Sequence, residues 1–139
     1  MEVRIAAASG LGRVGPSAEP AVHSLCECLG SANELLRWHA SFALGKIGAA
    51  AVPSLRSMMH SPEPVVALSA VDALEWIGEN AKDALDDLKG LSKSASWPLL
   101  QLACYSALAK ISGDASSAVP MIQVAMSSVA CAGPPPVMT

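Results

Sequence analysis

The feature that most constrains the fold is a short phrase that recurs four times along the chain. It reads LGRVG ending at Gly15, LGKIG ending at Gly48, LEWIG ending at Gly78 and, most altered, LAKIS ending at Ser112. The four closing residues are separated by 33, 30 and 34 residues. A period of this length is typical of solenoids, in which each repeat is one supersecondary unit. The sequence therefore predicts four similar units in the chain.

Each phrase closes a pattern with the period of an α-helix. Counting back from the closing residue, the positions at twelve, eight, five, four and one are apolar or small in every unit. These steps trace one face of a helix, and its small residues allow a neighbouring helix to approach closely. We expect this face to be buried in all four units. Its residues are Val3, Ala7, Gly10, Leu11 and Val14; Leu36, Ala40, Ala43, Leu44 and Ile47; Val66, Ala70, Ala73, Leu74 and Ile77; and Leu100, Cys104, Ala107, Leu108 and Ile111.

A second helical pattern follows each phrase, so each unit reads as helix A, a glycine turn and helix B. The glycine suits a helix end with positive φ, and Ser112 would be a poorer substitute backed by Gly113. No strand-like alternation occurs, which predicts an all-α fold. The units cover approximately 1–31, 32–60, 61–94 and 95–129, followed by a proline-rich tail at 130–139. In the B helices the repeated apolar positions are Ala18, Val22 and Leu25; Ala51, Leu55 and Met58; Ala81, Leu85 and Leu88; and Ala118, Ile122 and Ala125.

Helix starts are marked by capping residues and early prolines. Asn33 is suited to cap the A helix of the second unit. Ser61 directly precedes Pro62, and Ser96 stands two residues before Pro98; the first turn of a helix tolerates such a proline. We therefore expect Ser61 and Ser96 to cap the A helices of the third and fourth units.

The segment from Leu36 to Val66 resembles the short HEAT-like repeat of phycobilisome-lyase-type proteins. The first unit matches through Val3-Arg4, Ala6-Ala7 and the phrase ending at Gly15, whereas Ala67 and Gln101 replace the repeat's arginine in the last two units. The resemblance implies a right-handed, armadillo-like α-solenoid of about four two-helix repeats. It also implies that the B helices line the concave side, and that the chain serves protein–protein interaction.

Composition disfavours several other classes of protein. The net charge is −3 with no basic run, which argues against a nucleic-acid partner. The uncharged stretch 115–139 contains too many prolines and serines to be a membrane-spanning helix, and no secretory signal is visible. Only 15% of the residues are charged and 52% are hydrophobic, so we expect part of the surface to be covered by a partner.

The cysteines indicate a reducing intracellular compartment, either the cytoplasm or an organelle interior. Cys26, Cys28, Cys104 and Cys131 show no spacing of a disulfide framework, and fit small buried hydrophobic residues. His23, Cys26 and Cys28 form the one cluster that resembles metal ligands. On a helix Cys26 and Cys28 point about 200° apart, so we predict no metal site.

Enzymatic chemistry has little support in the sequence. None of the three histidines precedes a glutamate, as the iron-binding His-Glu pairs of deoxyhypusine hydroxylase repeats would require. No nucleophile–base pair stands at a helical spacing, and no phosphate-binding loop is present. We therefore expect a protein without catalytic residues and without a cofactor.

The candidate binding residues are polar positions on the B helices together with two tryptophans. An ordinary solvated surface, and simple packing of the tryptophans, are the competing interpretations. The first helical pattern starts at residue 2 without a capping unit, so either further repeats precede it or its open end docks on a partner. The candidates are His23, Glu27, Arg56, Lys82, Asp86, Lys89 and Gln123 on the B helices, with Trp38 and Trp76.

Function is predicted at the level of a class. The expected role is a scaffold or accessory subunit of a stable protein complex, with the proline-rich tail docking on a neighbour. Binding would use the concave B-helix face and the open ends of the solenoid. One alternative is a fragment of a bilin lyase or of a related cofactor-attachment or assembly factor. Another is a segment that only spaces other domains.

Overall fold

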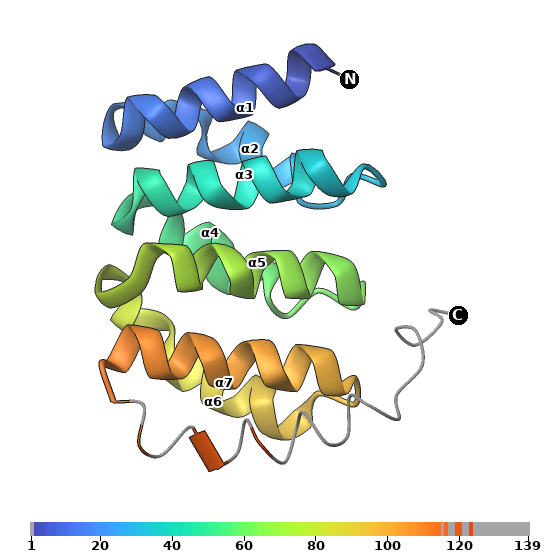
Figure 1. Ribbon diagram of the computed structural model, residues 1–139, viewed down its shortest axis with the longest axis vertical. Helices are drawn as coiled ribbons and strands as arrows, with labels where there is room; N and C mark the ends of the chain where they lie inside the picture. Colours follow the sequence, from blue (N-terminus) through green and yellow to red (C-terminus); the bar gives the residue numbers. More distant parts are fainter. Residues whose placement is uncertain (1, 115, 117–118, 121–122, 124–139) are drawn as a thin grey trace.

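The computed structural model describes residues 2–114, 116, 119–120 and 123, and within them the fold is all-α (Figure 1). The all-α solenoid predicted from the repeated phrase is confirmed. In the described part of the chain the α-helices are α1 (Glu2–Val14), α2 (Val22–Cys28), α3 (Glu34–Ile47), α4 (Val52–Met58), α5 (Pro64–Ile77), α6 (Leu85–Ser94) and α7 (Pro98–Ser112). Three short 3-10 helices join the pairs: η1 (Gly15–Ala21), η2 (Ala49–Ala51) and η3 (Gly78–Ala84).

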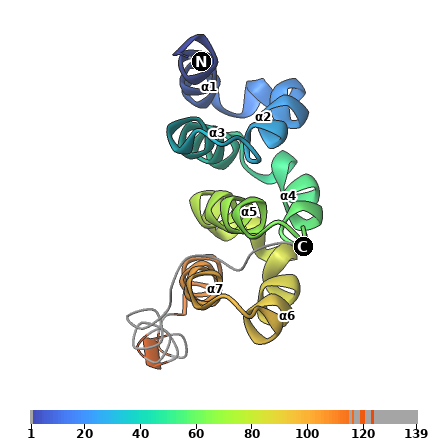
Figure 2. The same ribbon diagram turned by 90° about the vertical axis from the view of Figure 1, so that its right-hand side faces the viewer.

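The helices form two layers. The first helices of the units, α1, α3, α5 and α7, stack in one layer, and α2, α4 and α6 form the other (Figure 2). Each first-layer helix packs against the next one in the stack, α1 on α3, α3 on α5 and α5 on α7. Of the second helix predicted for the fourth unit, Ala118, Ile122 and Ala125 lie outside the described residues, and so does the tail with Cys131.

The turn after each first-layer helix depends on a glycine, as the phrase predicts. Gly15, Gly48 and Gly78 all have positive φ, between 72° and 87°, a conformation that L-residues with a side chain rarely adopt. The prediction for the fourth unit was wrong by one residue. Ser112 remains inside α7, and Gly113 takes the left-handed conformation with φ 76°. A serine β-carbon disfavours positive φ, so the helix continues until a glycine is available.

Two of the three predicted caps are also wrong. The Asn33 side chain accepts a hydrogen bond from the backbone N–H of Leu36 at 3.0 Å, so that cap is confirmed. However, Glu63 is the N-cap of α5, and Pro64 rather than Pro62 begins the helix. Trp97 rather than Ser96 is the N-cap of α7. In both helices a proline fills the first helical position, where its missing N–H costs nothing.

The predicted core face is largely buried in units two to four and partly exposed in unit one. In α3 all five predicted residues are buried, whereas Val66 and Leu108 are half-buried in the later units. In α1, Val3 and Val14 are 81% and 57% exposed, and Ala7 is exposed too. The prediction was wrong there because this face packs against the preceding unit of the stack, and no described residue covers it on α1.

Neighbouring first-layer helices approach closely where the phrase carries its first glycine. Gly12 in α1 is buried, and a β-carbon built on it would lie 3.3 Å from the α-carbon of Ala43 in α3. Small residues on both helices therefore bring the two backbones into contact. Among the residues described, no helix is both long enough and apolar enough to cross a membrane.

Candidate functional site

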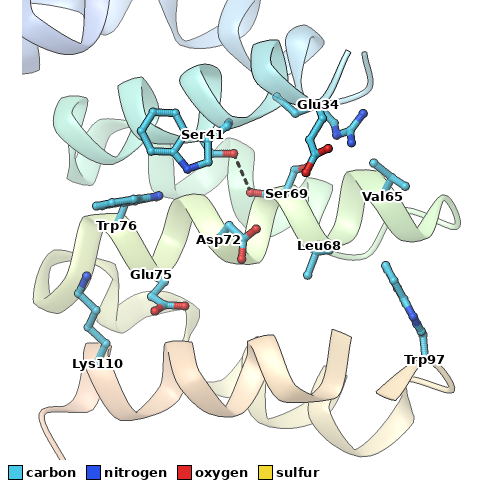
Figure 3. A pocket seen from close by; sticks show the side chains of 12 residues that line it. Glu34, Ser41, Val65, Leu68, Ser69, Asp72, Glu75, Trp76, Trp97 and Lys110 are labelled. Carbon is cyan, nitrogen blue, oxygen red and sulfur yellow. Dashed lines mark hydrogen bonds between the residues drawn. The ribbon is translucent and has the colours of Figure 1, made fainter. Parts of the chain in front are cut away.

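A groove of about 570 Å³ opens on the outer side of the first layer, across α3, α5 and α7. Figure 3 shows that Trp76 and Lys110 stand at one end of it and Trp97 at the other. Half of its lining comes from α5, the middle helix. The lining residues are Glu34, Arg37, Trp38 and Ser41 of α3; Val65, Leu68, Ser69, Asp72, Glu75 and Trp76 of α5; and Trp97 and Lys110 at α7.

Three aromatic side chains form a cluster at the end of the groove nearest Trp76. Trp38 and Phe42 lie one turn apart on α3, and their rings stack with centroids 5.6 Å apart and planes inclined by 4°. The ring of Trp76 meets both edge-on, at 5.1 Å from Phe42 and 6.2 Å from Trp38. Even so, Trp38 is 50% exposed and Trp76 is 43% exposed. The cluster therefore presents a fixed aromatic surface to solvent.

Lysine side chains cover part of this cluster. The Lys46 ammonium lies 5.3 Å from the Phe42 ring centroid, and the Lys110 ammonium lies 5.3 Å from the ring centroid of Trp76. Both distances are within the range at which a cation is attracted to an aromatic face. The cluster thus already accepts positive charge from the protein itself.

The floor of the groove is polar between its aromatic ends. The Ser41 hydroxyl donates to the Ser69 backbone carbonyl at 3.4 Å, and both residues are buried, so this bond ties α3 to α5 (Figure 3). One turn after Ser69, the carboxylate of Asp72 points from α5 into the groove. Glu75, three residues later, accepts a hydrogen bond from the Ser106 hydroxyl of α7 at 3.1 Å.

Asp72 lies in an unfavourable position for a carboxylate. It is half-buried, and no described residue donates a hydrogen bond to it or forms an ion pair with it. Burial, with a smaller contribution from the nearby Glu75 carboxylate, raises the pKa of Asp72 from 3.8 to about 6. The groove therefore contains a carboxylate that gains from any positively charged ligand.

Of the residues predicted from the sequence as binding residues, two line the groove. Trp38 and Trp76 meet in the groove. The others are exposed and line no part of it. His23 and Glu27 lie on α2, Arg56 on α4, Lys82 in η3, Asp86 and Lys89 on α6, and Gln123 in the short described stretch after α7.

On the second layer, some predicted binding residues are paired with one another or with neighbours. The Arg56 guanidinium contacts the Asp87 carboxylate at 2.6 Å, and the His60 ring lies 3.4 Å from the same carboxylate. The hydrogen bond from Arg56, then that from His60, lowers the pKa of Asp87. His23 and Glu27 pair along α2 at 3.2 Å. Arg56 thus links α4 to α6, and this contact within the chain explains the position of Arg56 without a role in binding another protein.

The described cysteines behave as core residues. Cys26 and Cys104 are buried, and burial raises the pKa of their thiols to about 11 and about 12. They are therefore poor nucleophiles at neutral pH. Across the part of the chain that the structure describes, no three potential metal ligands of the His, Cys, Asp and Glu types gather in one place.

Comparison with known families now decides the class of the chain. Residues 22–109, more than half of the sequence, match the family model described as HEAT repeats. The chain belongs to the HEAT-repeat family. Residues 3–31 also match the model of the PBS lyase HEAT-like repeat. No curated protein and no solved structure gives a significant match. Membership in the HEAT-repeat family supports a helical-repeat scaffold and leaves the partner open.

Sequence reasoning about this HEAT-repeat chain missed Asp72 and Glu75, although the repeat alignment contained a signal. Counting back from the closing glycines, Trp38 stands at ten, Asp72 at six, Glu75 at three and Trp76 at two. Steps of four, three and one describe a second stripe, which lies on the side of the first-layer helices roughly opposite their predicted buried face. A charged residue inside the apolar run of α5, next to Val71 and Ala73, was the visible sign of it.

Proposed function

We propose that this HEAT-repeat chain is a non-enzymatic protein-interaction scaffold or accessory subunit of a larger complex. Its main binding surface would be the groove on α3, α5 and α7. The observation that carries this proposal is the aromatic cluster, in which Trp38 and Trp76 contact each other and remain 50% and 43% exposed. Tryptophans are enriched among the residues that contribute most to protein–protein binding.

The surroundings of the two tryptophans favour binding over mere packing. Phe42 stacks on Trp38 and meets Trp76 edge-on, so neither indole needs much further ordering when a partner binds. A preorganised aromatic surface loses less conformational entropy on association than a flexible one. The two residues come from adjacent units, so a partner that covers both would span α3 and α5.

The polar groups of the groove suit contact rather than reaction. The Ser41 hydroxyl donates to a backbone carbonyl, so it is not paired with a general base. The Lys110 ammonium faces an aromatic ring at 5.3 Å. Asp72 and Glu75 are acids on one helix, without a described nucleophile between them. These features support a scaffold rather than an enzyme.

The remaining expectations stay predictions. The polar residues of α2, α4, η3 and α6 offer a second surface, on which Lys82, Asp86 and Lys89 have no described ion pair. Docking of the tail 130–139 on a neighbour, a stable complex and a reducing compartment are likewise untested. The alternative of a bilin lyase fragment or assembly factor rests on the repeat type alone.

Quantitative co-purification from the source cells tests the proposal. The tagged chain is compared with the double variant Trp38→Ala, Trp76→Ala, and with Lys89→Ala on the opposite layer as the matched control. Loss of two hot-spot side chains should lower the affinity for the partner by more than about tenfold, since each such residue contributes 2 kcal/mol or more to binding. The Lys89→Ala variant should retain the partner. Retention by the double variant, with its helical circular dichroism intact, would contradict the groove as the main surface.

A further inference from the structure

The carboxylate of Asp72 is left without a counter-charge although two cations line the same groove. The Arg37 guanidinium is turned away, because it donates to the backbone carbonyl of Ser31 at 2.6 Å. The Lys110 ammonium sits 5.3 Å from the Trp76 ring, and no ion pair joins it to Asp72. Both neighbouring cations are therefore engaged elsewhere, and the half-buried carboxylate retains an uncompensated cost of desolvation.

The charge of the groove around Asp72 is negative. Glu34 stands on its rim, and Glu75 lies three residues from Asp72 along α5. Glu75 is held by the neutral hydroxyl of Ser106, so its charge too is not balanced by a described cation. A ligand that brings positive charge into this part of the groove would relieve both carboxylates.

The aromatic wall beside the carboxylates is suited to the same charge. Lys46 and Lys110 already lie over the Phe42 and Trp76 rings at 5.3 Å, which shows that the cluster accepts cations at close range. The Trp38 side chain is 50% exposed, and no described lysine or arginine lies over its ring. Carboxylates next to an aromatic face are a combination that binds a long cationic side chain, whose methylene stem packs on the ring while its head meets the acid.

We propose that this groove binds its protein partner by taking a lysine or arginine side chain between the Asp72 and Glu75 carboxylates and the Trp38–Trp76 wall. This inference rests on the proposed function and names the chemistry that the scaffold recognises. A bound metal ion fits the site less well, because no described cluster offers three ligands. The cation therefore comes from the partner's side chain.

An NMR titration of the full chain tests this inference with a defined probe. The probe is the capped tripeptide acetyl-Leu-Arg-Leu-amide, and its control is the same peptide with citrulline, which keeps the shape of arginine and removes the charge. The readouts are the indole N–H signals of Trp38 and Trp76. We expect the citrulline peptide to bind at least about tenfold more weakly, in keeping with the strength of charge-assisted hydrogen bonds.

Two variants locate the effect. Asp72→Asn should abolish most of the preference for arginine over citrulline while the amide spectrum stays that of a folded chain. Asp83→Asn removes one negative charge from the exposed η3 and should keep the preference. If Asp83→Asn removed it equally, the effect would be general charge attraction and the inference would be overturned.

The remaining outcomes separate this inference from the proposed function. Equal affinity for the two peptides would overturn recognition of a cation and leave the groove as a protein-binding surface. If neither peptide moved the indole signals at about 10 mM, the inference would also be overturned. The co-purification experiment, which does not depend on a cationic side chain, would then decide whether the groove is a protein-binding surface.

Discussion

A β-carbon built on Gly45 of α3 would collide with the β-carbon of Trp76 of α5 and lie 3.3 Å from its α-carbon. The two helices approach this closely because Gly45 has no side chain. The same contact holds the Trp76 indole edge-on to Phe42. The first glycine of the phrase LGKIG thus supports one wall of the groove, whereas the second forms the turn.

Gly45→Ala is therefore expected to destabilise the fold. The added methyl group has to push α3 and α5 apart, and overpacking of this kind typically costs about 1–3 kcal/mol. Urea unfolding followed by circular dichroism measures the change. Gly90→Ala is the matched control, because Gly90 is exposed in α6 and nothing lies within 4 Å of its β-carbon position. The free energy of unfolding of the Gly90→Ala variant should rise by up to about 1 kcal/mol, because alanine favours the helix more than glycine does. The same sign for both variants would refute the close-approach argument.

Gly48→Ala tests the turn of the second unit. Gly48 has φ 87° and ψ −140°, and a β-carbon disfavours this backbone conformation even though the space around it is open. We expect a loss of about 1–3 kcal/mol in the free energy of unfolding. Ser112→Ala, at the helical position before Gly113, should cost much less, because Ser112 has ordinary helical geometry. Comparable losses in the two variants would mean that backbone conformation is not the cause.

Asp72→Asn is expected to stabilise the chain at neutral pH and not at acid pH. The pKa of Asp72 is about 6 in the fold, and 3.8 is its ordinary value. The native state therefore binds more protons between these values, and the free energy of unfolding falls as pH rises from about 4 to about 6. Besides Glu75, the charged groups around the groove are Glu34 and Arg37 of α3 and Lys110 of α7.

The Asp72→Asn variant removes the free-energy cost of burying the ionised carboxylate, which is fully present above pH 6. We expect it to gain about 1–2 kcal/mol at pH 7 and almost nothing near pH 4, since each unit of pKa shift corresponds to about 1.4 kcal/mol. Urea unfolding of both proteins across this pH range provides the measurement. A gain that stays constant from pH 4 to pH 7 would contradict burial of the carboxylate as the cause.

The Arg56–Asp87 pair between α4 and α6 should contribute little to stability. Its contact is short, at 2.6 Å, but both side chains are partly exposed to solvent. A double-mutant cycle with Arg56→Ala and Asp87→Ala should give a coupling energy of about 0.2–1 kcal/mol that shrinks at high salt. A large coupling that is insensitive to salt would show that the pair is more shielded than its exposure indicates.

Features that repeat between the units could be predicted from the sequence, and features specific to one unit could not. The closing glycines and the buried face of α3 recur in several units, so alignment of the units predicted them. The exposure of Val3 and Val14 could not be predicted in this way, because it depends on what lies against α1 rather than on the register. Caps were misplaced for a local reason, since a proline at the first helical position defines the start whether or not a serine precedes it.

The groove was harder to predict because its residues differ between the units. Trp38 corresponds to Leu68 in the next unit, and Glu75 corresponds to Gly45 in the unit before. A comparison that looks for shared residues passes over such positions. Their importance arises from contact between neighbouring units, where the missing side chain of Gly45 makes room for Trp76. Only the packed stack shows that the exposed tryptophans and the acids of α5 share one surface.

Site-specific photocrosslinking in the source cells tests most directly whether the partner binds the groove. Benzoylphenylalanine is placed at Glu34, on the exposed rim of the groove, or at Lys89, on α6 in the other layer. We predict a discrete adduct from position 34 that disappears when Trp38→Ala and Trp76→Ala are added, and none from position 89. An adduct from position 89 without one from position 34 would contradict the account and place binding on the second layer.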